Sequence, residues 1–277
     1  MIQDIPKTFR NEYTPVDPQG DDIVFAFQGH TFLAKEKDGL LICPMYKEIQ
    51  GRVQYLFAIG STHYFLALDP QKSTKYDWLS VRTLRHTQPK TLQFAGATAY
   101  HLYTWYQKNQ YCGCCGAKLE HSLHERAMVC PKCKNTIYPT IAPAVIVGVI
   151  YKDSICMTRY ANRPYKGHAL IAGFCEIGET PEQTVIREVH EEVGLKVKNI
   201  RYYKSQPWGF DSNLLMGFFC DLDGDPTITL QEEELAKARF IPRDEINDTY
   251  QDLSLTNEMI CVFKKGTKSN AKRTFFQ

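Results

Sequence analysis

Hydrophobic positions in the first part of the chain occur in short runs that are rich in β-branched and aromatic side chains. Such runs at 22–29, 52–60 and 63–69 are bounded by Gly, Asp or Pro, as expected for β-strands. From about Gln93 to Gln107 the spacing is instead that of a helix, with Ala and aromatic residues prominent. These patterns predict an N-terminal α+β domain over residues 1–108.

The hydrophobic pattern changes after residue 140. Long apolar runs at 141–153 and 168–178 predict buried strands, and a helix is predicted from Pro181 to about Val193. Strands and helices then alternate with mixed connections, which favours an α/β/α sandwich over residues 140–277. The remaining predicted elements are two strands at 200–208 and 214–222, and helical or turn segments around one strand at 231–242 and 243–249.

The chain has 277 residues, a length typical of about two domains and sufficient for a sizeable core. Its formal net charge is +2, which argues neither for nor against a nucleic-acid partner. No apolar run is long enough to span a bilayer, and the first residues lack the apolar segment of a signal peptide. A cytoplasmic location without membrane attachment is therefore the default expectation.

The chain contains ten cysteines, and in a reducing compartment they are not expected to form a disulfide framework. Within the segment 109–139, the pair Cys112 and Cys115 is followed after fourteen residues by a second C-x-x-C pair, Cys130 and Cys133. Two such knuckles supply four thiolates in a tetrahedron, the arrangement of a zinc ribbon. Five other cysteines are scattered and are expected to be small buried apolar residues: Cys43, Cys156, Cys175, Cys220 and Cys261.

Four thiolates close the coordination shell, so zinc bound there is expected to stabilise the fold rather than to catalyse a reaction. Cys114 is left unligated, because using it in place of Cys112 would break the two-residue gap to Cys115. A ribbon that contacts nucleic acid is the competing interpretation. Between the pairs only Lys118 and Arg126 are cationic, against two glutamates, which is few cations for a phosphate-binding surface.

Signals for both ends of a helix surround residues 181–193. Thr180 is a good N-cap, Pro181 suits the first helical position, and Gln183 can complete a capping box. Gly194 stands where a left-handed C-terminal residue belongs. The aliphatic residues of this helix are expected to face the core: Val185, Ile186, Val189 and Val193.

The spacing of Glu188, Glu191 and Glu192 places all three on one face of this helix. Clustered carboxylates repel one another unless they have a partner, and hard oxygen ligands suit Mg²⁺ or Mn²⁺. Arg187 can pair with Glu191 one turn further on. Taken alone, the three glutamates are more typical of a solvated acidic helix face than of a metal site, so the wider pattern has to decide.

That wider pattern is G-x5-E-x7-R-E-U-x-E-E-x-G-U, in which U is aliphatic, and the chain matches every fixed position. It resembles the Nudix box, a loop-helix-loop that binds divalent metals. The resemblance implies a hydrolase of nucleoside diphosphates linked to another moiety, with the catalytic set Arg187, Glu188, Glu191 and Glu192. The matching positions are Gly173, Glu179, Arg187, Glu188, Val189, Glu191, Glu192, Gly194 and Leu195.

The segment SQPWGFDSN, residues 205–213, resembles the SQPWPFPxS motif of NADH pyrophosphatases. That family also carries a four-cysteine zinc ribbon and a separate N-terminal domain. Gly209 and Asp211 stand where the family has prolines, and Asn213 stands where it has serine. These departures bear on substrate preference and not on the type of reaction.

Trp208 and Phe210 offer flat faces for a base or nicotinamide, although both also suit an ordinary core. The resemblance implies a substrate-binding loop made of Gln206, Pro207, Trp208, Gly209, Phe210, Asp211, Ser212 and Asn213. It also implies substrate contacts at Tyr138, at Arg82 in a Ser-Val-Arg motif, and at Lys35. For Arg82 and Lys35, a solvated surface role fits the residues as well as a functional one.

The resemblance implies that the metal shell also takes the backbone carbonyl of Ala172 and a fourth carboxylate from Glu234 or from one of the two glutamates before it. Water would attack one phosphorus of NADH or NAD, with Glu191 or Glu192 as general base. The products would be a nicotinamide mononucleotide and AMP. The family resemblance further implies a homodimer.

An RNA whose 5′ end carries NAD presents the same pyrophosphate, so removal of this cap is a second expected activity. One alternative is a Nudix hydrolase of another nucleoside diphosphate derivative, such as ADP-ribose or a dinucleoside polyphosphate. Another is a non-catalytic zinc-ribbon protein that binds nucleic acid and retains a decayed Nudix fold. The intact carboxylates of the box argue against this last alternative.

Overall fold

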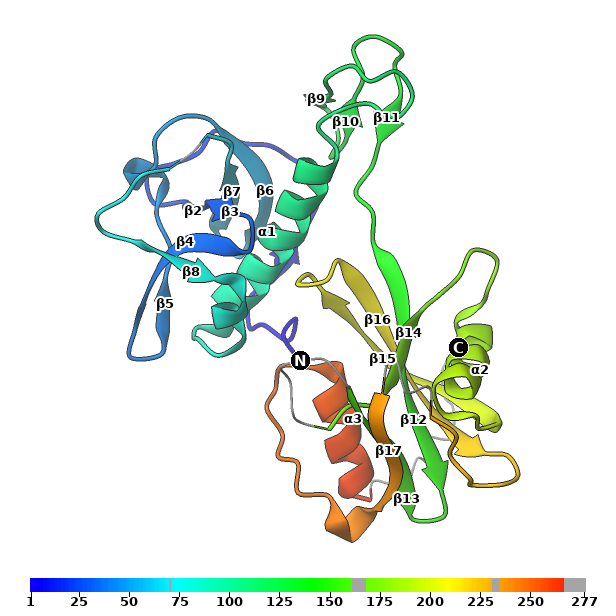
Figure 1. Ribbon diagram of the computed structural model, residues 1–277. Coiled ribbons are helices and arrows are strands. Elements are labelled where there is room, and N and C mark those ends of the chain that lie inside the picture. The colour runs from blue at the N-terminus through cyan, green and yellow to red at the C-terminus, as the bar shows by residue number, and fades with distance from the viewer. Residues whose placement is uncertain (70, 161–167, 231–234, 267–277) are drawn as a thin grey trace, which may run out of the picture. The chain divides into compact units, whose positions relative to one another are not determined.

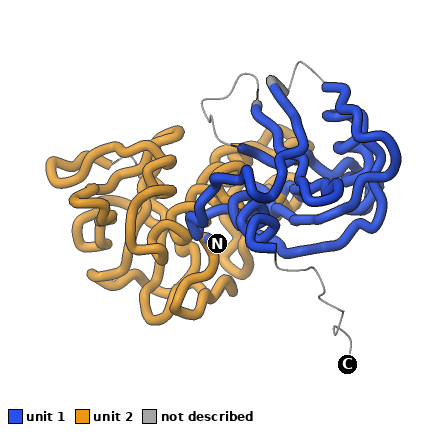
Figure 2. The backbone as a smooth tube through the Cα atoms, turned by 90° about the horizontal axis from the view of Figure 1, so that it is seen from below, with its two compact units in different colours: residues 1, 142–207, 213–277 blue, residues 2–141, 208–212 orange. Residues whose placement is uncertain are grey.

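The computed structural model describes residues 1–69, 71–160, 168–230 and 235–266. The chain divides into two compact units, coloured separately in Figure 2. The N-terminal unit contains residues 2–141 together with 208–212, and the C-terminal unit contains residue 1, 142–207 and the described residues from 213 onward. A five-residue piece of the later sequence therefore packs with the N-terminal unit.

The strands of the N-terminal unit are β1 (Phe9–Arg10), β2 (Ile23–Phe25), β3 (Phe27–Gln28), β4 (Thr31–Lys37), β5 (Leu40–Ile42), β6 (Val53–Ile59), β7 (Thr62–Ala67) and β8 (Asp77–Ser80). One sheet has the order β1-β6-β7-β2, and in the other β4 pairs with β3, β5 and β8. Large side chains with almost no exposure fill this core, among them Phe25, Phe32, Phe57 and Phe65. The three predicted apolar runs all contribute strands, so this prediction is confirmed.

Helix α1 (Lys90–Lys108) extends the predicted helix by a few residues at its N-terminal end. It packs against β6, β7 and the short 3-10 helix η2 (Val81–Arg85). Gly96 permits this close packing, because a Cβ there would lie 2.6 Å from a Leu84 methyl group. The helix therefore anchors η2, which carries the Ser-Val-Arg motif at its start.

A small antiparallel sheet follows α1 in the sequence. Its order is β11-β10-β9, with β9 at Glu120–His121, β10 at Met128–Val129 and β11 at Thr136–Ile137. These two-residue strands are too short to bury a core, so cross-linking by another agent is needed to hold the segment. The two C-x-x-C pairs lie in this segment.

The C-terminal unit is built on one sheet with the order β15-β16-β12-β13-β17, with β14 also paired to β12. Strand β12 is parallel to β16 and antiparallel to β13 and β14. The strands are β12 (Ala142–Tyr151), β13 (Ser154–Tyr160), β14 (Ile171–Phe174), β15 (Val197–Trp208), β16 (Asn213–Leu222) and β17 (Leu235–Pro242).

Helices cover both faces of this sheet (Figure 1). Along β12, Val145 and Val147 share a buried cluster with Val185 and Val189 of helix α2 (Pro181–Val193). The side chains between them point the other way, because successive residues of a strand face opposite sides. On that second face, buried side chains of the sheet pack with helix α3 (Leu255–Lys264). The predicted α/β/α sandwich is therefore confirmed.

Two expectations for the C-terminal unit need correction. Ile186 was expected to face the core but is 49% exposed, because it lies beyond the edge of the apolar stripe formed by Val185 and Val189. Helix α3 was not predicted, although Ser254 caps its N-terminus and Leu255 and Met259 lie one turn apart and are completely buried. Of the segments expected to be helical or turn-like, the short helix η3 spans Arg243–Glu245.

Within the part of the chain that the structure describes, no helix is long and apolar enough to cross a membrane. The scattered cysteines are free thiols. Four of them are buried, as expected for small apolar residues, whereas Cys175 is half-buried at the edge of a core cluster. Burial raises the pKa of the Cys43 and Cys156 thiols to about 12, so both stay protonated and uncharged.

Candidate functional site

Helix α2 begins and ends at the residues that its capping signals predict. The Thr180 side chain accepts a hydrogen bond from the Gln183 amide at 3.2 Å, and the Gln183 side chain accepts one from the Thr180 amide at 2.8 Å. Gly194 closes the helix with φ of 70°, a left-handed conformation that glycine adopts without strain. These local bonds fix the residues at which the helix begins and ends.

Arg187 is the centre of a charged network on α2. Its Nε and Nη2 donate to the two carboxylate oxygens of Glu179 at 2.7 and 2.9 Å. Its Nη1 donates to Glu188 at 2.8 Å and to Glu191 at 2.9 Å, and Nη2 also donates to the Phe174 carbonyl at 2.9 Å. A guanidinium whose three nitrogen atoms all donate hydrogen bonds fixes the orientation of the carboxylates that it contacts.

Glu179 keeps this arginine in place. Hydrogen bonds from Arg187 and from the backbone N–H of Glu176 lower the pKa of Glu179 to about 2. The hydroxyl of buried Thr184 donates a further hydrogen bond to Glu179 at 3.0 Å. Glu179 is therefore a carboxylate at any pH near neutrality, and the same pairing raises the pKa of Arg187.

Gly173 makes room for the carboxylate of Glu188. A Cβ built on Gly173 would lie 1.9 Å from Cδ of Glu188, closer than any side chain can tolerate. Gly173 lies on β14 and pairs with Val145 of β12, so its backbone cannot move aside easily. The first glycine of the box is thus required by the position of Glu188, whose side chain is 13% exposed.

The other two glutamates lie in different surroundings. Glu192 is 3% exposed, whereas the Glu191 side chain is 51% exposed. Burying a carboxylate costs free energy, which a divalent cation or hydrogen bonds can offset, so the position of Glu192 is compatible with a cation site. Ala172, on β14, pairs with Ile146. The residues predicted to bind Mg²⁺ or Mn²⁺ offer hard oxygen atoms, as these cations require, while Glu234 lies outside the described residues.

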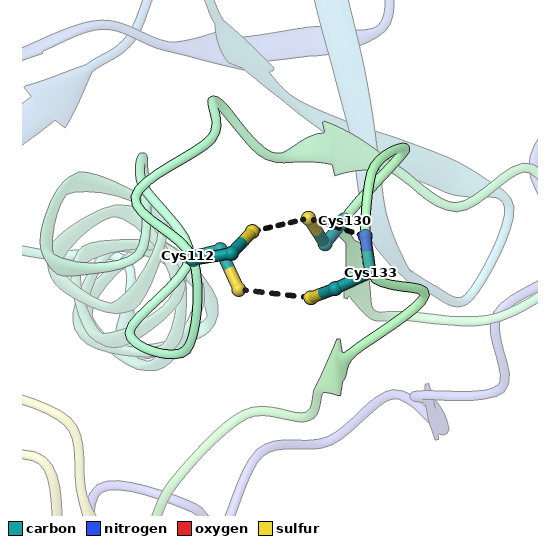
Figure 3. Close-up of side chains that lie close together, drawn as sticks. Cys112, Cys130 and Cys133 are labelled. Atoms are coloured by element: carbon teal, nitrogen blue, oxygen red, sulfur yellow. Dashed lines mark hydrogen bonds between the residues drawn. The ribbon is translucent and has the colours of Figure 1, made fainter.

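The four cysteines selected by their spacing converge in space, and Figure 3 shows Cys112, Cys130 and Cys133 pointing toward one another. All four sulfur atoms, including that of Cys115, lie within 4.8 Å of one another. The Sγ–Sγ distance is 3.6 Å for Cys112 and Cys133, and 3.5 Å for Cys115 and Cys130. Tetrahedral zinc with thiolate ligands requires sulfur separations of about 3.8 Å, so the cluster fits zinc.

Backbone donors support thiolates at this cluster. The N–H groups of Cys114 and Cys115 lower the pKa of Cys112 to about 6. The N–H of Cys133 donates to Sγ of Cys130 at 3.4 Å. Cys114 is exposed and lies outside the converging set, so it contributes its backbone and not its thiol.

We expect the Cys130→Ser variant to lose its zinc, because three thiolates and a hydroxyl cannot reproduce the closed shell. The Cys114→Ser variant should retain about one zinc ion per chain, since its thiol is not a ligand. Elemental analysis of the two purified proteins by mass spectrometry measures this. Equal loss of zinc from both variants would show that the ligand set has been assigned wrongly.

The loop that follows β15 belongs to the N-terminal unit. Its two aromatic rings, Trp208 and Phe210, are half-buried and meet edge to face with ring centroids 4.9 Å apart. Trp208 Nε1 donates to Asp211 at 3.0 Å, and the guanidinium of Arg85 lies 5.3 Å from the centre of the indole. Ser212 adopts a positive φ of 61°. The rings thus retain partly exposed surface, as a site for planar ligands requires.

Comparison with known proteins identifies the two segments that carry these sites. The NUDIX domain model matches residues 140–261, and the NADH pyrophosphatase zinc ribbon domain model matches residues 107–138. The proteins called NAD-capped RNA hydrolase NudC from Escherichia fergusonii and Enterobacter sp. (strain 638) are both 39% identical to this chain over 177 residues. That alignment covers 64% of this chain in both cases, and 68% and 67% of the two relatives.

The chain belongs to the Nudix superfamily, in its zinc-ribbon NADH pyrophosphatase family. Among solved structures, a NUDIX hydrolase from Nitrosomonas europaea aligns with 57% of this chain and 92% of its own, at 24% identity and a TM-score of 0.49. The family model of the ribbon ends at residue 138, and the NUDIX model begins two residues later. The two family models therefore match consecutive segments of this Nudix hydrolase that do not overlap.

Gln206 has a different environment from the one its motif suggested. It is completely buried, its Nε2 donates to the Leu253 carbonyl at 2.8 Å, and its Oε1 accepts from the Leu255 N–H at 2.7 Å. In this Nudix hydrolase the amide therefore ties β15 to the start of α3. Its neighbour Pro207 is exposed, and Asn213 lies half-buried at the first position of β16.

The remaining predicted substrate residues lie in the N-terminal unit. Lys35 is exposed on β4, and Arg82 is exposed in η2, where its backbone N–H donates to the Ser80 hydroxyl at 3.3 Å. Tyr138 is 56% exposed, and its hydroxyl donates to Glu125 at 3.1 Å. Each of these side chains is accessible, which a substrate contact requires.

Sequence reasoning missed the roles of two residues. Glu179 matched the Nudix box, but its hydrogen bond with Arg187 was not predicted. That contact depends on the loop that brings residue 179 next to helix α2. Arg85 carries no motif, and its position over Trp208 depends on the packing of η2 with a segment more than a hundred positions later. A partner so distant in sequence leaves no local signal.

Proposed function

We propose that this Nudix hydrolase cleaves the pyrophosphate of NADH and NAD to a nicotinamide mononucleotide and AMP, and that it removes NAD from RNA 5′ ends. The observation that carries the proposal is the combination of a NADH pyrophosphatase zinc ribbon with an intact Nudix box in one chain. Relatives with 39% identity are named NAD-capped RNA hydrolases, which supports both substrates.

We assign the divalent-metal site to Glu188, Glu191, Glu192, the Ala172 carbonyl and Glu234. Mg²⁺ or Mn²⁺ bound there would neutralise phosphate oxygens and acidify the attacking water. The structural zinc would be held separately by the cysteine cluster, which has no open position for a substrate.

The protein's own groups would supply orientation and proton transfer. Arg187 holds Glu188 and Glu191 through charge-assisted hydrogen bonds, so neither carboxylate has to be ordered during the reaction. The proton of the attacking water would pass to Glu191 or Glu192, both of which lie in the last turn of α2. Oxygen from water then joins one phosphorus, and the bond from that phosphorus to the bridging oxygen breaks.

On the substrate side, Trp208 and Phe210 would hold a planar ring, with Gly209, Asp211, Ser212 and Asn213 shaping the loop around them. For Gln206 we propose a positioning role in place of direct contact, because its amide already binds the backbone at both ends. Lys35, Arg82 and Tyr138 would provide further polar contacts, and Pro207 would restrict the backbone at the start of the loop.

We also propose a cytoplasmic location and a homodimer. Four thiolates that bind zinc remain reduced most readily in a reducing compartment, which supports the location. The homodimer rests on the family resemblance, and light scattering on the purified protein measures it. We propose that the chain has three parts: an N-terminal domain at residues 1–108, the zinc ribbon at 109–139 and the hydrolase domain at 140–277.

The Phe210→Ala variant tests the substrate assignment. Loss of one stacking face should reduce kcat/KM for NADH by roughly 5- to 150-fold. The reduction should be smaller for ADP-ribose, which lacks the nicotinamide ring. Steady-state kinetics on NADH, NAD, ADP-ribose, diadenosine polyphosphates and NAD-capped RNA measures it. Equal losses on NADH and ADP-ribose, together with a lower melting temperature, would indicate a core aromatic and a less specific Nudix hydrolase.

A further inference from the structure

The loop at 208–212 is held by the N-terminal unit through contacts that its family motif does not predict. Gly209 is buried against helix α1, and a Cβ there would lie 2.1 Å from the carbonyl oxygen of Ala97. The proline that the family has at this position carries a Cβ and so cannot occupy this backbone path. The Gly209 departure therefore belongs to a loop that approaches α1 more closely than a proline allows.

The second departure from the family motif, Asp211, lies in the same loop. Its carboxylate accepts the indole N–H of Trp208 at 3.0 Å, a bond that proline could not make. Arg85 lies over the same indole, 5.3 Å from the ring centre, within the range of a cation–π contact. The ring therefore has a carboxylate at its N–H edge and a guanidinium over one face.

These two contacts reinforce each other. A cation over the ring draws electron density away from the indole and strengthens its N–H as a donor, while the carboxylate increases the negative charge of the ring. Phe210 meets the indole edge to face, which restricts the ring on a further side. Trp208 is thereby held in one orientation before any ligand arrives.

We propose that Arg85 and Asp211 are positioning residues that fix the Trp208 indole for a planar ring of the substrate, and that they set how tightly dinucleotides bind. The inference rests on the proposed function, because it assumes that Trp208 faces the substrate. It links the N-terminal unit, through η2, to substrate affinity. It also gives a single explanation for two of the three departures from the family motif, Gly209 and Asp211.

The kinetic test compares Arg85→Met with a matched control, Arg52→Met, which removes an exposed arginine elsewhere in the same unit. Arg85→Met should raise the KM for NADH by roughly 2- to 30-fold, the range of a cation–π contact, with little change in kcat. Arg85→Lys keeps the cation and should recover most of the loss. Arg52→Met should leave both constants unchanged.

A double-mutant cycle separates positioning from general destabilisation. In a Trp208→Leu background, Arg85→Met should have little further effect on KM, because no aromatic ring remains for Arg85 to orient. The same holds for Asp211→Ala. Full additivity of the effects in this cycle would overturn the proposal.

A spectroscopic readout does not depend on activity. The chain has three tryptophans, and the indole N–H signal of Trp208 is identified in ¹⁵N-labelled protein by its loss in Trp208→Phe. Asp211→Ala should speed exchange of this proton with solvent and shift its resonance, while the other two indole signals stay in place. If the Trp208 indole signal is unchanged in Asp211→Ala, the proposal that Asp211 fixes the ring is wrong.

The two readouts separate the failure of each hypothesis. If the unaltered protein cleaves no NADH while the indole signal responds as expected, Arg85 and Asp211 do hold the Trp208 ring, but the proposed function is wrong. The positioning proposal then fails for dinucleotides as well. If NADH is cleaved but neither the KM nor the indole signal responds to Arg85→Met and Asp211→Ala, only the positioning proposal is wrong.

Discussion

Replacement of Glu188 or Glu192 by glutamine is expected to lower kcat on every substrate by at least about 100-fold, because metal-ion catalysis contributes several kcal/mol. Glutamine retains the shape of the side chain but removes the charge that a divalent cation requires. The loss of kcat should be similar for NADH, NAD, ADP-ribose and NAD-capped RNA, since all of them contain the pyrophosphate. Steady-state rates at saturating Mg²⁺ or Mn²⁺ measure it.

Glu182→Gln on the same helix is the matched control. Glu182 is exposed in the first turn of α2 and is not one of the proposed metal ligands. This variant should retain full activity and a similar melting temperature. Near-normal turnover in Glu188→Gln or Glu192→Gln would contradict the assignment of the metal site, and unfolding of either variant would be seen separately by circular dichroism.

Gly173→Ala is expected to lower activity by roughly 10- to 100-fold, the range seen when the support of a metal ligand is removed. The added methyl group would occupy the space of the Glu188 carboxylate, 1.9 Å from its Cδ. Since Gly173 is paired to β12, the carboxylate and not the strand has to move. Activity and apparent metal affinity are the measured quantities.

The control for this change is Gly20→Ala, where the nearest atom to the new Cβ is 3.8 Å away, an ordinary contact. That variant should behave like the unaltered protein. If Gly173→Ala binds Mn²⁺ and turns over normally, the position of Glu188 against Gly173 is not the productive one. A combined Gly173→Ala and Glu188→Gln variant should be no worse than Glu188→Gln alone, because both changes affect the same ligand.

Local signals made the most accurate predictions. Helix α2 begins after Thr180 and ends at Gly194, as its cap residues predict, because these bonds form between residues close in sequence. The zinc cluster is similar, since two short knuckles fix each pair of cysteines before the pairs meet. Spacing alone therefore excluded Cys114.

Predictions that depend on distant partners were less complete. The motif around Gln206 indicated a ligand contact, but the amide is used by Leu253 and Leu255, which lie almost fifty positions later. Likewise, the hydrophobic spacing did not show that residues 208–212 pack with the N-terminal unit. Such contacts depend on how separate elements pack, and a single sequence carries no local trace of that packing.

The most direct measurement of the central claim is hydrolysis of NADH in ¹⁸O-labelled water with Mg²⁺ or Mn²⁺, followed by mass spectrometry of the products. Attack of water on one phosphorus predicts equal amounts of AMP and reduced nicotinamide mononucleotide, with labelled oxygen on the phosphate of one of them. Glu192→Gln should form neither product at an appreciable rate. Release of free dihydronicotinamide with ADP-ribose, or no cleavage of NADH while ADP-ribose is hydrolysed, would contradict the account.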